Sequence, residues 1–295
     1  MPETRHRPFS PARIAAITSN TFTELVRLKV FYFLLIFALL LIANSVFMAR
    51  LSFQQEFQVL KDVSLGAMSI FTSLLAIVAT AQLLPRDLED RTIYTILAKP
   101  VPRYEYLIGK LAGVLLLLGL SILAMSAVFL AVLFVREEML VKETLRQSAG
   151  LRPEQVQEAL RGLKGSAFNA NLFPGIVIIY LKASLLAALT LFISTFATSN
   201  IFTIVVMVFI YFIGHLQATA REYWLQEHGA GWLAKTFLAV VALAFPDLQL
   251  FNLVDDIVAG TAIPTGLFLQ TVVLGCVYTS IYLFFAWVAF HGREL

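Results

Sequence analysis

Long stretches without a charged residue alternate with shorter polar segments along this chain. Four of them cover residues 30–49, 63–84, 111–135 and 257–292, and the last contains a candidate span at 264–290. The hydrocarbon core of a bilayer is roughly 30 Å thick, and a helix of about 20 apolar residues crosses it. Each stretch therefore predicts one transmembrane helix.

A fifth apolar stretch, residues 172–220, carries one charged residue and is too long for a single crossing. The Thr-Ser-Asn sequence at 198–200 interrupts it with residues that favour turns. Two spans at 174–197 and 201–217, joined by a tight turn, fit this pattern better than one. The sequence thus predicts an all-α, polytopic membrane protein in which six transmembrane helices form a single domain over the whole chain.

An amphipathic segment, residues 10–29, precedes the first span. Ser10 and Pro11 are typical of the N-cap and the first turn of a helix. Apolar residues of this segment fall on one helical face and polar residues mostly on the other, as in helices that lie in the membrane interface. We expect an interfacial helix here; a polar extension of the first span is the alternative.

Two longer segments between spans are predicted to lie outside. Residues 136–171 are rich in charged residues and predict a helical insert, which offers a surface to an external partner. Residues 218–262 contain the apolar run 236–246, which is too short to cross and more typical of re-entrant helices. We expect short re-entrant helices before the last span. The alternative is that 236–246 forms a seventh span, which would put the C-terminus outside.

The composition supports residence in a membrane and narrows the chemistry. Hydrophobic residues make up 59% of the chain and charged residues 14%, whereas soluble domains carry about 25% charged residues. The net charge of +3 is too small to predict a nucleic-acid partner. The four histidines match no metal-ligand pattern, and the best match to a phosphate-binding loop, at 229–236, has Ala234 where that loop needs glycine. We therefore expect no catalytic residue, metal or cofactor in this chain.

The basic residues of the short loops predict the orientation. Cytoplasmic loops are richer in Lys and Arg, and short loops close to the span ends count most. The loop at 85–110 is short and carries five basic residues, whereas the 136–171 segment offsets its basic residues with five Glu. Both termini and the 85–110 loop are therefore expected in the cytoplasm.

The loop at 85–110 carries the most specific pattern in the chain. It starts with acidic residues, where the dipole of a short helix would favour them, and a lysine follows at the expected end of that helix. Pro100 and Pro102 then favour an extended exit, because proline disfavours α geometry in the residue before it. Gly109 and Gly113 form a small-xxx-small pattern that allows another helix to approach closely.

This loop resembles the cytoplasmic signature of ABC-2-type transporter permeases, the membrane subunits of ATP-binding cassette transporters. Members carry an acidic stretch, a short coupling helix and a run of the form Leu-x-Lys-Pro-x-x-Arg-x-x-x-Leu-x-Gly-Lys. The matching residues here are Leu97, Lys99, Pro100, Arg103, Leu107, Gly109 and Lys110. An interfacial N-terminal helix, six spans and dipping helices before the last span are also expected of that family. The segment at 22–29 is most similar in style to the branch associated with multicopper-enzyme maturation. Thr92 after Arg91 departs from the Gly-Thr that many members have.

The resemblance implies a mechanism and a set of partners. Two copies of this chain, or this chain and a related permease, would pair among the lipids of a bacterial cytoplasmic membrane. Each would dock a separate ABC ATP-binding subunit, which holds ATP and Mg²⁺, so this chain would be the non-catalytic permease of an exporter. The residues expected to contact the ATPase subunit are Glu89, Asp90, Arg91, Thr92, Leu97, Pro100 and Arg103. A secondary transporter or channel without an ATPase is the alternative, but such proteins normally carry intramembrane acids or inverted repeats.

Lys182 lies well inside the span predicted at 174–197. A charged residue at this depth is a candidate for a functional site, here a substrate pathway or a pairing role. A lysine can also extend its side chain part of the way to the headgroups. The sequence leaves both interpretations open.

Overall fold

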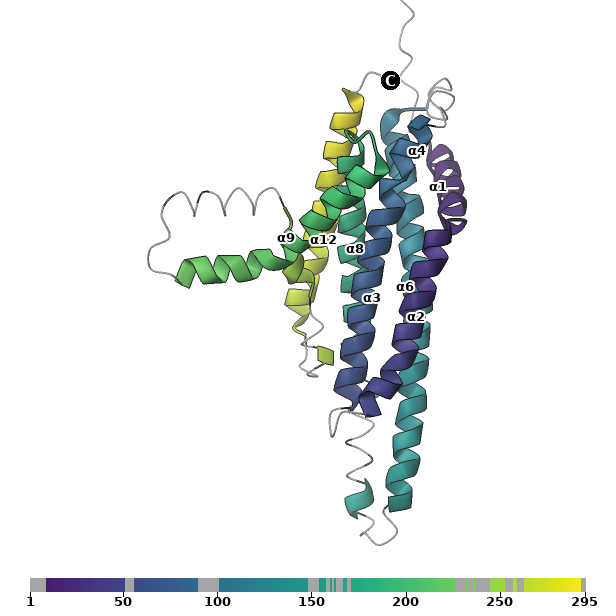
Figure 1. Cartoon of the computed structure of the whole chain (residues 1–295), viewed down its shortest axis with the longest axis vertical. Coiled ribbons are helices and arrows are strands. Elements are labelled where there is room, and N and C mark those ends of the chain that lie inside the picture. Colours follow the sequence, from purple (N-terminus) through teal and green to yellow (C-terminus); the bar gives the residue numbers. More distant parts are fainter. Residues whose placement is uncertain are drawn as a thin grey trace, which may run out of the picture.

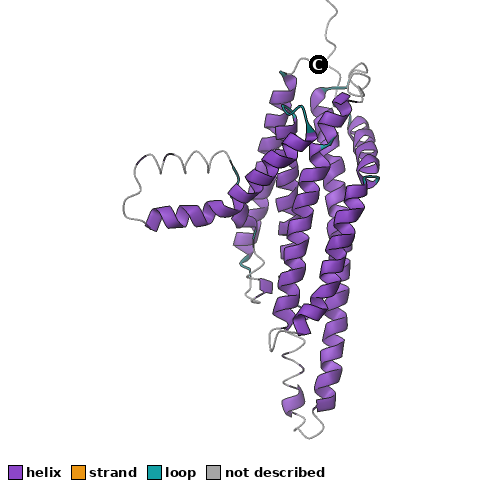
Figure 2. Ribbon diagram, viewed as in Figure 1, coloured by secondary structure: helices purple, strands orange, loops and turns teal. Residues whose placement is uncertain are grey.

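The computed structural model describes residues 9–50, 56–89, 101–147, 154–157, 160, 162, 167–168, 171–226, 232, 236, 245–252, 257–258 and 263–292. These residues form helices and connecting turns, and no strand occurs among them (Figure 2). The principal elements are α1 (Pro11–Val26), α2 (Lys29–Arg50), α3 (Glu56–Ala81), α4 (Leu83–Glu89), α6 (Arg103–Gln147), α8 (Leu172–Ser194), α9 (Asn200–Gln226), the 3-10 helix η1 (Leu248–Phe251) and α12 (Thr265–His291). The predicted all-α fold class is confirmed.

Six helices in the described part of the chain are long and apolar enough to cross a membrane. They are α2, α3 with its continuation in α4, α6, α8, the first 18 residues of α9, and α12. Each overlaps one of the six spans predicted from the sequence, and the turn expected near residues 198–200 separates α8 from α9. The chain is a multi-pass membrane protein.

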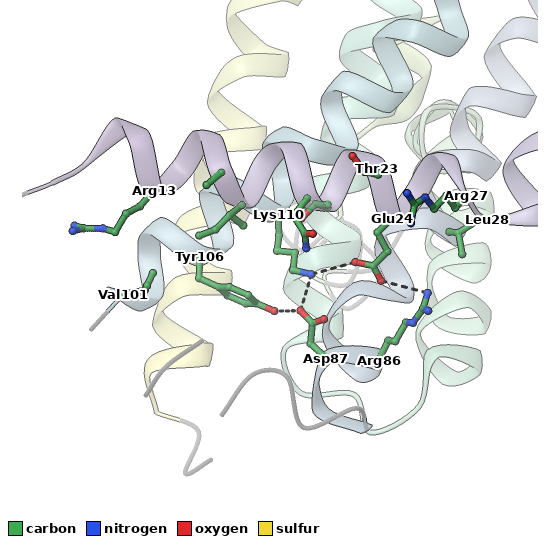
Figure 3. A pocket seen from close by; sticks show the side chains of 14 residues that line it. Arg13, Thr23, Glu24, Arg27, Leu28, Arg86, Asp87, Val101, Tyr106 and Lys110 are labelled. Atoms are coloured by element: carbon green, nitrogen blue, oxygen red, sulfur yellow. Dashed lines mark hydrogen bonds and ion pairs between the residues drawn. The ribbon is translucent and has the colours of Figure 1, made fainter. Parts of the chain in front are cut away.

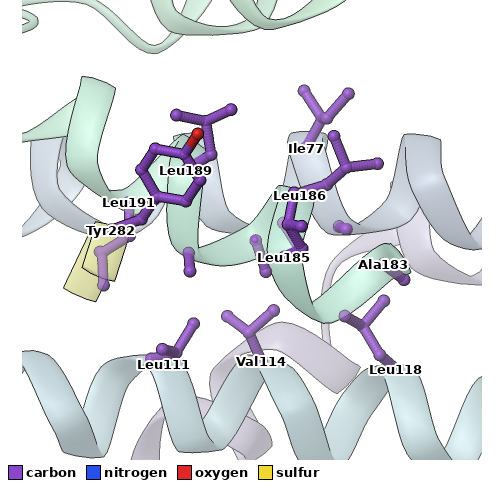
Figure 4. Packing of buried hydrophobic residues seen from close by; sticks show 14 of the residues in the cluster. Ile77, Leu111, Val114, Leu118, Ala183, Leu185, Leu186, Leu189, Leu191 and Tyr282 are labelled. Carbon is purple, nitrogen blue, oxygen red and sulfur yellow. The ribbon is translucent and has the colours of Figure 1, made fainter. Parts of the chain in front are cut away.

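Helix α8 is the centre of the bundle. Every residue from Lys182 to Leu191 is buried, and α8 packs against α3, α6 and α12. Figure 4 shows the apolar side chains of these four helices meeting in one layer. By contrast, α2 and α12 turn large apolar side chains outward, including Phe33, Phe47 and Phe284, as expected of helices that face lipid. In Figure 1, α9 crosses the bundle obliquely, and its last turns point away from it.

Helix α6 extends far beyond the span predicted at 111–135. It has 45 residues, which makes it about 67 Å long at 1.5 Å per residue. The beginning of the predicted 136–171 insert is therefore a direct continuation of the span. The physical reason is that residues 120–147 contain neither glycine nor proline, so nothing ends the helix where the charges begin. Arg136 also fixes this continuation to α3, because its Nε donates to Glu56 at 3.0 Å.

A break separates α3 from α4 inside the same predicted span. Gln82 forms a turn between the two helices, three residues before Pro85. Proline has no N–H to donate to the carbonyl four residues earlier, and its ring crowds that carbonyl. Helix α4 therefore starts at Leu83, ahead of the acidic residues that were expected to start a coupling helix.

The amphipathic segment at 10–29 forms a helix of its own. Helix α1 ends at Val26 and α2 starts at Lys29, so residues 11–26 are not an extension of the first span, and only Lys29, the last residue of the segment, belongs to that span. Pro11 occupies the first turn as predicted, but the side chain of Ser10 makes no capping hydrogen bond. Helix α1 packs on α6, and its location in the membrane interface stays a prediction. So do the re-entrant helices, since most of 236–246 lies outside the described residues.

Candidate functional site

The end of the bundle that carries α4 also carries α1, the start of α6 and the end of α12 (Figure 1). Arg103, the first residue of α6, joins two of these elements. Its Nη1 donates to the main-chain oxygens of Phe290 and His291, both at 2.8 Å. The last carbonyls of a helix lack intrahelical donors, so Arg103 caps α12. The N-terminal helix and the C-terminal end of the last span thus lie on one side, as an even number of crossings requires.

A buried ion pair closes the base of the predicted coupling loop. Asp87 lies in α4, near the start of the 85–110 loop, and Lys110 lies in α6, at the end of that loop. Lys110 Nζ is 2.6 Å from Asp87 Oδ2, and these side chains are 3% and 10% exposed. The hydroxyl of Tyr106 also donates to Asp87 Oδ2. Three side chains on both flanks of the loop therefore form one hydrogen-bonded unit (Figure 3).

Helix α1 is tied to the same unit through Glu24. Its Oε1 lies 3.3 Å from Nη1 of Arg86, and its Oε2 lies 3.8 Å from Nζ of Lys110. Figure 3 shows Glu24 between these two cations, one from α4 and one from α6. Through this carboxylate, a displacement of either flank of the loop reaches α1.

A second ion pair anchors the start of α1 to α6. Arg13 donates from Nε and Nη2 to the two carboxylate oxygens of Glu105, at 2.6 and 2.8 Å. The backbone N–H of Ser10 donates to the same carboxylate at 3.0 Å, and the Glu105 side chain is fully buried. The hydrogen bonds that Arg13 donates to Glu105 raise the pKa of the Arg13 guanidinium above its ordinary value. Paired donors in this fork geometry fix orientation as well as distance.

Two glycines let α1 approach α6 closely. A Cβ on Gly109 would lie 2.7 Å from Cγ2 of Ile17, and a Cβ on Gly113 would lie 2.7 Å from Cβ of Thr21. Both distances are too short for carbon atoms in contact, so neither position has room for a side chain. The small-xxx-small pattern predicted a close approach, and its partner is the N-terminal helix.

These contacts surround a pocket of about 790 Å³ between α1, α4 and the start of α6. Its polar lining includes Arg13, Glu24, Arg86, Asp87 and Lys110. Arg13, Arg86 and Lys110 of this lining are each in one of the ion pairs described above. Within the described part of the chain, no three His, Cys, Asp or Glu side chains gather as a metal site would need.

Of the seven residues predicted to contact an ATPase, Glu89 and Arg103 lie in the described part of the chain. Glu89 lies in the last described turn of α4. Asp90, Arg91, Thr92, Leu97 and Pro100 lie outside the described residues, so their role stays a prediction. Arg103 starts α6 and donates to the last carbonyls of α12, as given above. Sequence reasoning missed the pairing of Asp87 and Glu24 with Lys110, although Lys110 is the last residue of the family-like run.

Lys182 is the other charged residue singled out from the sequence. It is 2% exposed, and its Nζ donates to Oγ of Ser69, in the middle of α3, at 2.8 Å. The side chain therefore points into the bundle and does not extend toward a headgroup region. Its part in a substrate pathway or in pairing stays a prediction.

No family model matches the chain, and no curated protein matches it. The resemblance to ABC-2-type permeases therefore rests on the sequence features given above, chiefly the 97–110 run.

Proposed function

We propose that this chain is the membrane subunit of an ATP-driven exporter of the ABC-2 type. It works in the cytoplasmic membrane of a bacterium with both termini in the cytoplasm. It acts with a second copy of itself and with separate ATP-binding subunits, and it holds no nucleotide itself.

The observation that carries this proposal is the ion pair at the base of the loop. Asp87 and Lys110 flank the segment that resembles the coupling helix of the family, and they are joined at 2.6 Å in a buried site. Breaking such a buried pair costs about 3–5 kcal/mol. A displacement of the loop that costs less than this therefore moves α4 and the start of α6 together. A force on the loop then reaches α3 through α4, and the centre of the bundle through α6.

The N-terminal helix adds a second path for the same force. Glu24 links α1 to both flanks of the loop, and the close contacts at Gly109 and Gly113 hold α1 against α6. In the proposed cycle, ATP binding closes the partner ATPases and shifts the loop. The braced unit transmits that shift to α3 and α6, which both pack against α8, and so changes the packing of the central helix.

The test is a charge reversal on the loop, in the complex with an ABC ATPase from the same genome that binds this chain. Glu89→Lys combined with Asp90→Lys removes the acidic end offered to the ATPase. We expect ATP hydrolysis by the complex in nanodiscs to fall to the level of the isolated ATPase, while membrane insertion is unchanged.

The matched control reverses two neighbouring acids at the opposite end of α6. Glu137→Lys with Glu138→Lys changes the net charge equally, on the far side of the bundle from α4. This control should leave hydrolysis unaltered. Equal hydrolysis in the loop variant and in the unmodified complex would refute the coupling role, and would favour a transporter or channel without an ATPase.

A further inference from the structure

The group around Lys182 has a definite hydrogen-bonding pattern. Nζ of Lys182 lies 3.2 Å from Nε2 of His215 in α9, and 5.7 Å from the ring centroid of Tyr211. An ammonium only donates hydrogen bonds, so Nε2 of His215 accepts. Its Nδ1 then carries the hydrogen and donates to the carbonyl of Tyr211 at 2.9 Å. The histidine is thus neutral, and Ser69, His215 and the Tyr211 ring are all uncharged ligands of one cation.

The positive charge of Lys182 has no anionic partner in the described part of the chain, where its polar contacts are Ser69 and His215. The charge of one acidic residue, Asp247, acts on His215. Its carboxylate caps η1 by accepting from the N–H of Gln249 at 3.1 Å. Buried charges are normally paired, and charged residues inside membranes mark binding sites or pathways. Two of the three N–H groups of the ammonium thus have acceptors, and its charge has no anionic partner among the described residues.

Two features indicate what kind of anion fits: the depth of Lys182 along α8, and the helix α9 that covers it. Lys182 lies ten residues after the start of α8, which is about 15 Å along the helix axis and near the centre of a bilayer. His215 and Tyr211 come from α9, whose other face exposes Phe209, Phe212 and Leu216. Only one helix therefore separates Lys182 from the lipid-facing surface. An acyl chain can lie along that apolar surface while its headgroup reaches the lysine past α9.

We propose that Lys182, with Ser69 and His215, forms a binding site for the anionic headgroup of an amphiphile, a carboxylate or a phosphate monoester on an alkyl chain. The headgroup takes the place of Nε2 of His215 on the ammonium, and Ser69 keeps its hydrogen bond. As a statement about cargo, this inference rests on the proposed transport function; as a statement about binding, it does not.

The test uses the purified full-length chain in nanodiscs of phosphatidylcholine, without ATPase or nucleotide. The probes are dodecyl phosphate and dodecanoate, with dodecanol as the neutral amphiphile and inorganic phosphate as the free anion. Binding is measured from the rise in the thermal unfolding midpoint with probe concentration. We expect at least one anionic amphiphile to bind tenfold or more tightly than dodecanol, and inorganic phosphate to have no effect.

Variants locate the site. Lys182→Met and Lys182→Gln should bring the affinity for the anionic probe down to that for dodecanol, and Lys182→Arg should keep it within a few-fold. Lys142→Met removes an exposed lysine from the outer part of α6 and should change nothing. Two neutral substitutions are used, so that if one variant misfolds the other can still be measured. The comparison of the probes on the unmodified chain requires neither variant.

Several results would overturn the inference. Equal affinity for dodecyl phosphate, dodecanoate and dodecanol would do so, as would undiminished anion preference in Lys182→Met. Competition by inorganic phosphate alone would exclude an amphiphile. Dimerisation that depends on Lys182, without any anion preference, would mean that a carboxylate of a second copy is the partner. Because no ATPase is present in this test, anion binding can be observed even if the chain is not a transporter. Absence of anion binding, in turn, would not refute the proposed transport function.

Discussion

The pair formed by Asp87 and Lys110 can be tested by a double-mutant cycle. Lys110→Met removes the cation and leaves the Asp87 carboxylate, 10% exposed, with the Tyr106 hydroxyl as a remaining donor. An uncompensated buried charge costs about 3–5 kcal/mol, and the remaining hydrogen bond favours the lower end, about 3 kcal/mol. Asp87→Asn keeps the shape of the side chain and should cost about 2 kcal/mol, the worth of a charge-assisted hydrogen bond. The double variant should cost at least about 1 kcal/mol less than the sum of the two single variants, because contacting residues couple by roughly 0.5–3 kcal/mol.

The assay is equilibrium unfolding in mixed micelles, followed by circular dichroism as the fraction of denaturing detergent increases. The control is the cycle on Glu138 and Lys142, an exposed pair one helical turn apart at 3.3 Å, with side chains 54% and 72% exposed. Exposed pairs of this spacing couple by about 0.3–0.5 kcal/mol. If the Asp87–Lys110 cycle couples no more strongly than this control, the base of the loop is not braced and the proposed path of force is wrong.

Three further predictions follow from the packing and the topology. Gly113→Leu should displace α1 from α6 and lower the unfolding midpoint. Gly66→Ala, where an added Cβ meets nothing within 4 Å, should leave the midpoint unchanged or raise it. Equal midpoints for the two variants would contradict the close approach of α1 to α6. Arg103→Gln should speed amide hydrogen exchange in the last turn of α12, which loses two capping bonds, and unchanged exchange there would show that Arg103 does not hold this end. In a cysteine-free background, Glu138→Cys should react with an impermeant maleimide in intact cells, and Thr23→Cys only after permeabilisation; the opposite pattern would invert the proposed orientation.

The apolar runs were sufficient to predict the six membrane helices, because a long uncharged stretch has few alternatives to a span. Local breakers were also informative. The Thr-Ser-Asn sequence at 198–200 separates α8 from α9 as predicted. Charges were weaker guides to helix ends: α6 passes through Arg136 without interruption, since charged residues such as Glu, Lys and Arg are good helix formers.

Contacts between distant residues could not be predicted from spacing. Asp87 and Lys110 are 23 positions apart, and the cross-link through Glu24 depends on how α1 crosses α6. The direction of the Lys182 side chain is another example. A lone lysine in an apolar stretch leaves two outcomes open, and the choice depends on Ser69, 113 positions away. Such pairings belong to the packed bundle and have no local signal.

The central claim is that this chain works with a separate ATP-binding subunit, and its most direct test is ATP hydrolysis by the reconstituted pair. The chain is coexpressed with the candidate ABC ATPases of the same genome, purified and assembled in nanodiscs, and hydrolysis is compared with that of each ATPase alone. The account predicts a complex with two copies of each chain and hydrolysis above that of the isolated ATPase. A chain that binds no such subunit, or that leaves its hydrolysis rate unchanged, would contradict it.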